Sequence, residues 1–120
     1  MINDDPIFHL ALPSDWAAAF VDGVYLISTR GMTLDDVGFI HCSTREQMDN
    51  TANGFYGDVE QLVVLVIDPS LVPSPVVHER PAPDVDTLFP HIYGPLPVAA
   101  VNQAVMWLRE PGTAWSFSAL

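Results

Sequence analysis

Four polar side chains lie close together where a predicted strand meets a predicted helix, and they are His41, Ser43, Arg45 and Gln47. The free backbone N–H groups and the dipole at a helix start favour an anion. A histidine, a hydroxyl, a guanidinium and an amide around such a start could hold a phosphate, a carboxylate or a pyrophosphate. The alternative is that His41 only hydrogen-bonds the backbone and that Arg45 lies in solvent.

Strand alternation sorts the residues that lead into this helix. In an extended segment, Phe39, His41 and Ser43 share one face, and Ile40 and Cys42 share the other. Cys42 therefore points with the apolar set and is expected in the core. A buried thiol near acidic residues forms a thiolate poorly, so Cys42 is not expected to be a nucleophile.

Two further residues could supply acid–base or electrostatic chemistry. His9 lies on the first predicted strand and would neighbour His41 if the two strands pair. Glu79 shares a strand face with the apolar Val77, which places its carboxylate either at a sheet edge or in a pocket.

A rigid aromatic segment covers residues 89–95 and reads FPHIYGP. His91 and Tyr93 share one face of it, so both could contribute to a binding site. The same segment could equally be a packing element that closes over the sheet.

Metal binding and several nucleophile classes lack their sequence signatures. No two histidines are spaced four apart on a helix, and no CxxC or HExxH pattern occurs. Neither a G-x-x-x-x-G-K phosphate loop nor a G-x-S-x-G elbow is present.

The apolar periodicity and the turn residues predict a small α+β domain with a mostly antiparallel, split or curved sheet and two short helices. One helix is expected over 14–20 with Ser14 as its N-cap. The other is expected over 43–53, opened by a capping box of Ser43 and Glu46 and ended by Gly54. Strands are expected at 7–12, 24–28, 38–42, 62–67, 76–80 and 89–93, with a loop at 31–36. The unbroken apolar run 62–67 indicates a central strand covered on both faces, and 98–108 favours a turn and then a strand over a helix.

Length and charge narrow the classes of partner. The 120 residues suit a single domain, and the net charge is −11, with 15 acidic residues, four arginines and no lysine. Nucleic acids and anionic membranes bind mainly through lysine and arginine, so neither is an expected partner. No apolar run is long enough to span a bilayer, and a secretory signal is not evident. With Cys42 as the one cysteine, a reducing, cytoplasmic location is expected.

The motifs GFIHCS (38–43) and FPHIYGPL (89–96) give the chain a family resemblance. Together with Ile7, Trp16 and the 62–68 strand, they resemble the family of bacterial and plant proteins of unknown function numbered 952. The spacing agrees from about residue 7 to residue 105, which leaves 106–120 as a C-terminal extension. Members of this family look like small relatives of the ADP-ribosyltransferase fold, which binds NAD in a cleft between two sheets.

The resemblance implies roles for particular residues. His9 would lie on the strand that corresponds to the first catalytic strand of the transferases, His41 and Ser43 would line the nicotinamide side, and Glu79 would be a third element. The sequence departs from the transferase pattern because no glycine follows His9 and Glu79 lacks the usual flanking signature. RNA 2′-phosphotransferases share the fold, but their polyanionic substrate conflicts with the charge of −11.

The residues therefore predict a small-ligand pocket, and the resemblance implies NAD or a related ADP-ribosyl nucleotide as its ligand. In that hypothesis Arg45 meets the pyrophosphate, His41 orients the ribose, and Glu79 stabilises positive charge as nicotinamide leaves. The candidate residues are His9, His41, Ser43, Arg45, Gln47, Glu79, His91 and Tyr93. The alternative is a non-catalytic binding or regulatory module that uses the same cleft, or a surface of Trp107 and Trp115, for a partner.

Overall fold

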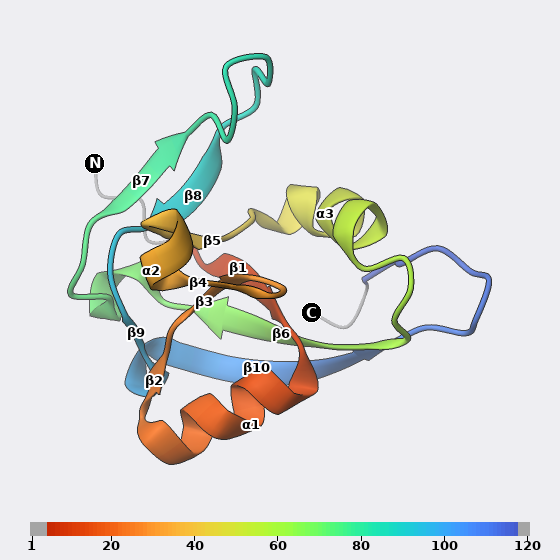
Figure 1. Ribbon diagram of the computed structural model, residues 1–120, viewed down its shortest axis with the longest axis horizontal. Coiled ribbons are helices and arrows are strands. Elements are labelled where there is room, and N and C mark those ends of the chain that lie inside the picture. Colours follow the sequence, from red (N-terminus) through yellow and green to blue (C-terminus); the bar gives the residue numbers. More distant parts are fainter. Residues whose placement is uncertain (1–4, 118–120) are drawn as a thin grey trace.

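The computed structural model describes residues 5–117, and within them two antiparallel sheets, two small strand pairs and three α-helices form the fold (Figure 1). The strands are β1 (Ile7–Ala11), β2 (Val24–Tyr25), β3 (Ile27–Thr29), β4 (Met32–Thr33), β5 (Ile40–His41), β6 (Gln61–Ile67), β7 (Val76–Glu79), β8 (Phe89–Ile92), β9 (Leu96–Pro97) and β10 (Val101–Leu108). The helices are α1 (Pro13–Asp22), α2 (Leu34–Val37) and α3 (Met48–Phe55), with 3₁₀ turns at Arg45–Gln47, Pro69–Leu71 and Val98–Ala100. The expected α+β class with mostly antiparallel strands is confirmed.

The first sheet has the order β1-β6-β10, with β6 in its centre. The odd-numbered residues of β6 from Val63 to Ile67 pack in one core with Ala19 of α1. Its even-numbered residues from Leu62 to Val66 pack in a second core with Met48 of α3. The prediction of a central strand covered on both faces is thus confirmed, because each alternating set of side chains has its own core.

The second sheet has the order β5-β8-β7 and extends away from the first (Figure 1). Backbone hydrogen bonds between Phe8 and Ser43 join the two sheets, since each N–H donates to the other residue's carbonyl at 2.8 and 2.7 Å. This junction brings His9 of β1 beside His41 of β5. The smaller pairs are β2 with β9 and β3 with β4.

The C-terminal segment belongs to the core. As expected for 98–108, a 3₁₀ turn is followed by strand β10. Trp107 and Trp115 are 5% and 2% exposed and pack together in the core below α3. A partner surface built from these two tryptophans is therefore contradicted. Residues 118–120 of the expected extension lie outside the described residues.

Helix α1 begins earlier than expected. Its N-cap is Leu12 and Pro13 occupies the first turn, so the expectation that Ser14 is the N-cap is wrong. The physical reason is that proline presets the helical φ and lacks the N–H that would go unbonded there. Gly23, with φ of 84°, ends the helix after Asp22.

The predicted loop at 31–36 is also wrong, because β4 and helix α2 occupy it. Thr33 caps this helix: its hydroxyl accepts from the Asp36 N–H at 3.2 Å, and the Asp36 carboxylate accepts from the Thr33 N–H at 2.9 Å. A threonine followed three residues later by an aspartate was the signal that the sequence reading did not use.

The capping box before α3 is displaced by one residue. Thr44 and Gln47 form it in place of Ser43 and Glu46, and the Gln47 side-chain oxygen accepts from the Thr44 N–H at 2.9 Å. Gly54 lies inside α3, which continues to Phe55 and ends at Tyr56. Strand β5 is shorter than the predicted 38–42, because Gly38 ends α2 with φ of 97°.

Candidate functional site

A cavity of about 220 Å³ lies between the β3–β4 hairpin, β5 and α3. Its polar lining includes His9, Ser28, Thr29, His41, Ser43 and Thr51. Its apolar lining includes Leu10, Met32, Val37, Phe39, Phe55 and Pro81, with the ring of Tyr56 beside them. None of these lining residues is Asp, Glu, Lys or Arg, so the cavity offers hydrogen bonds and aromatic faces without a fixed charge.

The side chains of residues 39–43 alternate between two faces, as predicted, and one face lines this cavity. Phe39, His41 and Ser43 line it, whereas Ile40 and Cys42 are buried in the core on the other face. Burial raises the pKa of the Cys42 thiol, so Cys42 stays protonated and unreactive.

Ser28 is the most informative residue of the lining. It is 1% exposed, and its hydroxyl oxygen has no hydrogen-bond partner among the described residues. Buried hydroxyls nearly always have a partner, because an unsatisfied one is destabilising by about 1–3 kcal/mol. Ser28 therefore contributes an unpaired donor and acceptor to the wall of a partly aromatic cavity.

His9 is buried and fully engaged. Its Nδ1 lies 2.7 Å from the backbone carbonyl of His41, and its Nε2 lies 2.8 Å from the Tyr25 hydroxyl. Because a carbonyl can only accept, Nδ1 carries the proton, and Nε2 accepts from Tyr25. Burial lowers the pKa of His9 to about 4, so the ring is neutral near pH 7. His9 forms part of the cavity wall, with neither ring nitrogen left over.

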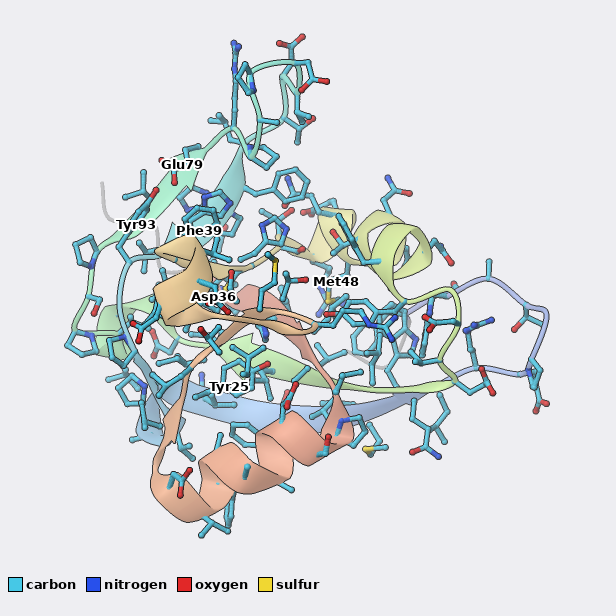
Figure 2. All side chains as sticks on the ribbon, viewed as in Figure 1. Tyr25, Asp36, Phe39, Met48, Glu79 and Tyr93 are labelled. Carbon is cyan, nitrogen blue, oxygen red and sulfur yellow. The ribbon has the colours of Figure 1, made fainter. Side chains whose placement is uncertain are left out.

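A chain of side chains runs from the cavity to the far edge of the second sheet. His41 Nδ1 lies 3.2 Å from His91 Nε2, and His91 Nδ1 lies 2.7 Å from a carboxylate oxygen of Glu79. The Tyr93 hydroxyl donates to the same Glu79 oxygen. Phe39 stacks on His91 at 3.9 Å between ring centroids, and Figure 2 places it beside Glu79 and Tyr93.

The electrostatics of this chain favour a neutral His41 and an ionised Glu79. Burial, with a smaller contribution from His91, lowers the pKa of His41 to about 4. The hydrogen bonds from Tyr93 and then from His91 hold the pKa of Glu79 below its usual range. The same contact with Glu79 raises the pKa of Tyr93.

The eight residues singled out from the sequence fall into three places. His9, His41 and Ser43 line the cavity, and the Ser43 hydroxyl lies 3.2 Å from that of Thr51. Glu79, His91 and Tyr93 lie behind the cavity, where His91 contacts His41. The other two lie elsewhere: the Gln47 amide donates to the Leu88 carbonyl at 2.7 Å, and the Arg45 guanidinium lies over the Phe8 ring in a separate hollow.

Sequence reasoning missed Ser28, Tyr25 and Thr51. The Arg30-Gly31 turn, whose glycine has φ of 75°, was a signal for the β3–β4 hairpin that carries Ser28, but not for its unpaired hydroxyl. For Tyr25 and Thr51 no local signal existed, since their partners are distant in sequence.

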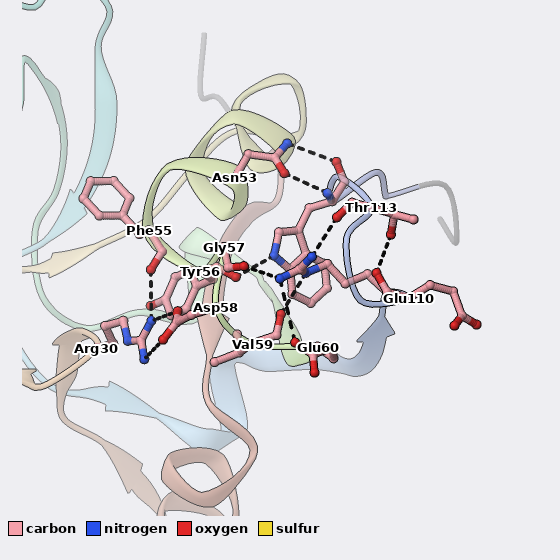
Figure 3. A network of polar contacts seen from close by, with 12 residues as sticks. Arg30, Asn53, Phe55, Tyr56, Gly57, Asp58, Val59, Glu60, Glu110 and Thr113 are labelled. Carbon is pink, nitrogen blue, oxygen red and sulfur yellow. Dashed lines mark hydrogen bonds and ion pairs between the residues drawn. The ribbon is translucent and has the colours of Figure 1, made fainter.

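Arginine contacts hold the end of α3 and the loop that follows it (Figure 3). Arg30, in the hairpin turn, donates to the Phe55 carbonyl and to both Asp58 carboxylate oxygens. Arg109 donates to backbone carbonyls of the loop that follows α3, including Val59 at 2.8 Å. The cavity therefore has a preformed shape on this side.

Among residues 5–117, no group of histidine, cysteine and carboxylate side chains is arranged to hold a metal ion. Over the same residues, no helix is long and apolar enough to cross a membrane.

The fold and the cavity define a small α+β domain with two antiparallel sheets and a compact, uncharged pocket at their junction. The chain belongs to the family of proteins of unknown function DUF952, whose model matches residues 10–104. It is similar to the crystal structure of protein CC0527 from Caulobacter crescentus, with 26% identity, 92% of this chain and 93% of that chain covered, and a TM-score of 0.77. The solution NMR structure of CC0527 gives a TM-score of 0.67 at 26% identity, with 89% and 91% covered. No curated protein matches the chain.

Proposed function

We propose that this single-domain protein binds a compact, uncharged ring compound in the cavity between β3, β5 and α3. The observation that carries the proposal is Ser28, which lines the cavity and whose buried hydroxyl has no hydrogen-bond partner within residues 5–117. A ligand amide or hydroxyl would satisfy it and remove the penalty of an unpaired buried polar group.

The lining indicates the chemistry of the ligand. Phe39, Phe55 and Tyr56 offer aromatic faces to a flat ring. An ionised ligand would find no countercharge in the lining and would lose its hydration, which is strongly unfavourable. Neutral ring compounds with one polar edge fit these conditions.

The size of the cavity limits how much of a nucleotide could enter. At about 220 Å³ it is smaller than the ~300 Å³ at the lower end for drug-sized ligands. Of NAD, the ligand suggested by the likeness to ADP-ribosyltransferases, only the nicotinamide part is small enough to enter. Because that ring is positively charged within NAD, we infer that free nicotinamide, which is neutral, is the better ligand. The pyrophosphate would remain outside, and Arg45 lies in a different hollow. A reducing, cytoplasmic setting completes the proposal, since Cys42 is buried and free.

A thermal-shift comparison tests this assignment. Free nicotinamide should raise the melting temperature more than NAD, whose nicotinamide ring is positively charged, and ADP-ribose, which lacks the nicotinamide ring, should not raise it. At a hundred times its dissociation constant, a ligand should add about 2.7 kcal/mol of stability. Stabilisation by ADP-ribose but not by nicotinamide would mean that the adenine or the phosphates bind, which contradicts the nicotinamide assignment.

Ser28→Ala is the matched variant. It should leave the ligand-free protein at least as stable as the wild type, because the hydroxyl has no hydrogen bond to lose. It should weaken nicotinamide binding by about 1 kcal/mol, roughly fivefold. If Ser28→Ala binds as tightly as the wild type, the hydroxyl has no part in recognition.

A further inference from the structure

The hydrogen bonds behind the cavity link Glu79, His91 and His41 in one chain. An ionised Glu79 can only accept, so His91 donates from Nδ1. The other nitrogen of His91, Nε2, lies 3.2 Å from His41 Nδ1, so this geometry lets His41 donate to it from Nδ1. In that tautomer, neutral His41 carries its own lone pair on Nε2.

The Nε2 atom of His41 has no hydrogen-bond partner within residues 5–117. His41 lines the cavity, whereas His91 and Glu79 do not. Because Nδ1 of His41 contacts His91, Nε2 is the ring nitrogen that remains for a ligand. His9 cannot take the same role, because both of its nitrogens are engaged.

We propose that His41 is a general base for a ligand or a water molecule in the cavity, and that His91 and Glu79 are positioning residues that fix its tautomer and carry the proton away. This inference rests on the proposed function, because it requires a ligand in the cavity. The site would then be catalytic rather than a binding module alone.

The proton transfer balances without a further reactant. The O–H or N–H bond of the bound molecule breaks, its heteroatom keeps the electron pair, and an N–H bond forms at Nε2 of His41. The Nδ1 proton of His41 then moves to His91 Nε2 across 3.2 Å. The resulting His91 imidazolium is paired with the Glu79 carboxylate at 2.7 Å.

Two measurements on the intact protein test the relay without an identified substrate. Long-range proton–nitrogen NMR of the imidazole rings should show wild-type His41 protonated at Nδ1. In His91→Phe, which removes the acceptor, His41 should shift to the Nε2–H form. A wild-type His41 that is protonated at Nε2 overturns the proposal, whether or not the variant folds.

The second measurement is acylation by diethyl pyrocarbonate, which attacks unprotonated imidazole nitrogens, followed residue by residue with mass spectrometry. His41 should react, with the exposed His78 as the internal reference and His9 protected. His91→Phe should slow His41 acylation by about tenfold or more, the scale of losing an orienting partner. Glu79→Gln, which keeps the size but removes the charge, should also slow it. Equal His41 rates in the wild type and both variants would contradict a positioning role.

Binding and base chemistry are separated by the nicotinamide shift. His91→Phe should keep the nicotinamide-induced rise in melting temperature, because Ser28 and the aromatic lining remain. If nicotinamide binds but His41 is not protonated at Nδ1, the relay is overturned and the proposed function stands. If His41 is protonated at Nδ1 but no neutral ring compound raises the melting temperature, the proposed function is overturned instead.

Discussion

His41 and His91 are directly opposite one another in the β5–β8 pair, with Nδ1 of the first 3.2 Å from Nε2 of the second. The next pair in the register is Ile40 with Ile92, and both of these residues are fully buried. A slip of one residue would exchange the faces of β8 and put an isoleucine where His91 lies. Core packing of the isoleucines therefore sets the alignment of the histidines.

The pH dependence of stability should report the buried histidines. For His9 and His41 the folded-state pKa is about 4, below the ordinary value of 6.5. Between these values the unfolded chain binds more protons, so stability is complete above about pH 6.5 and falls as the pH drops towards 4. His9 alone should contribute on the order of 3 kcal/mol to this fall.

Urea denaturation from about pH 7.5 to about pH 4.5 measures that fall. His9→Gln should be less stable than the wild type near neutral pH and should show a shallower loss on acidification. The exposed His78→Ala variant is the control. A wild type that is equally stable across this range would show that these rings are not held neutral by burial.

Gly94→Ala should destabilise the protein through a steric clash. A Cβ at Gly94 would lie 1.9 Å from the Ser74 hydroxyl oxygen and 2.6 Å from the Ser74 Cβ. The expected loss is about 1–3 kcal/mol in denaturant titration. Adding Ser74→Gly should restore much of it. Gly57→Ala, whose nearest new neighbour is 3.7 Å away, is the matched control and should change stability by only about 0.5 kcal/mol.

Gly54→Ala should stabilise the protein. Gly54 lies in helix α3, and an added Cβ would meet nothing within 4 Å. Alanine reduces the backbone entropy of the unfolded chain, so the gain should be roughly 0.5–1 kcal/mol. The midpoint of a urea titration measures it, and a loss of stability would argue that α3 ends before Gly54.

Nucleic acid should not bind at physiological salt. Each phosphate contact needs a cation, and the chain has four arginines and no lysine. Two of these arginines already donate to backbone carbonyls: Arg30 at the C-terminal end of α3, and Arg109 in the loop that follows it. Fluorescence anisotropy with labelled RNA and duplex DNA checks this expectation, and micromolar binding that weakens steeply with salt would refute it.

The local parts of the fold could be read from the sequence because their causes are local. The apolar run of β6 required cover on both faces, and alternation directed Phe39, His41 and Ser43 to one side. The capping box of the 3₁₀ turn before α3 begins at Thr44, one residue later than predicted, since Ser43 and Thr44 carry equivalent hydroxyls and only the backbone geometry separates them.

The contacts that complete the candidate site could not be read in this way. Glu79 and Tyr93 meet only because β7 and β8 pair in one register, and His91 meets His41 only because β8 also pairs with β5. Ser28 looked like an ordinary strand residue, and its importance depends on the absence of a partner, which a sequence does not display.

The most direct measurement of the central claim is a proton–nitrogen NMR titration of the protein with nicotinamide. If a neutral ring occupies the cavity, the largest amide shifts should fall on cavity residues such as Ser28, Thr29 and Phe39, and they should saturate together. The same titration of Ser28→Ala should show the same residues responding at a higher ligand concentration. Shifts confined to the hollow around Arg45 and His78, or no saturable shift at all, would contradict the claim.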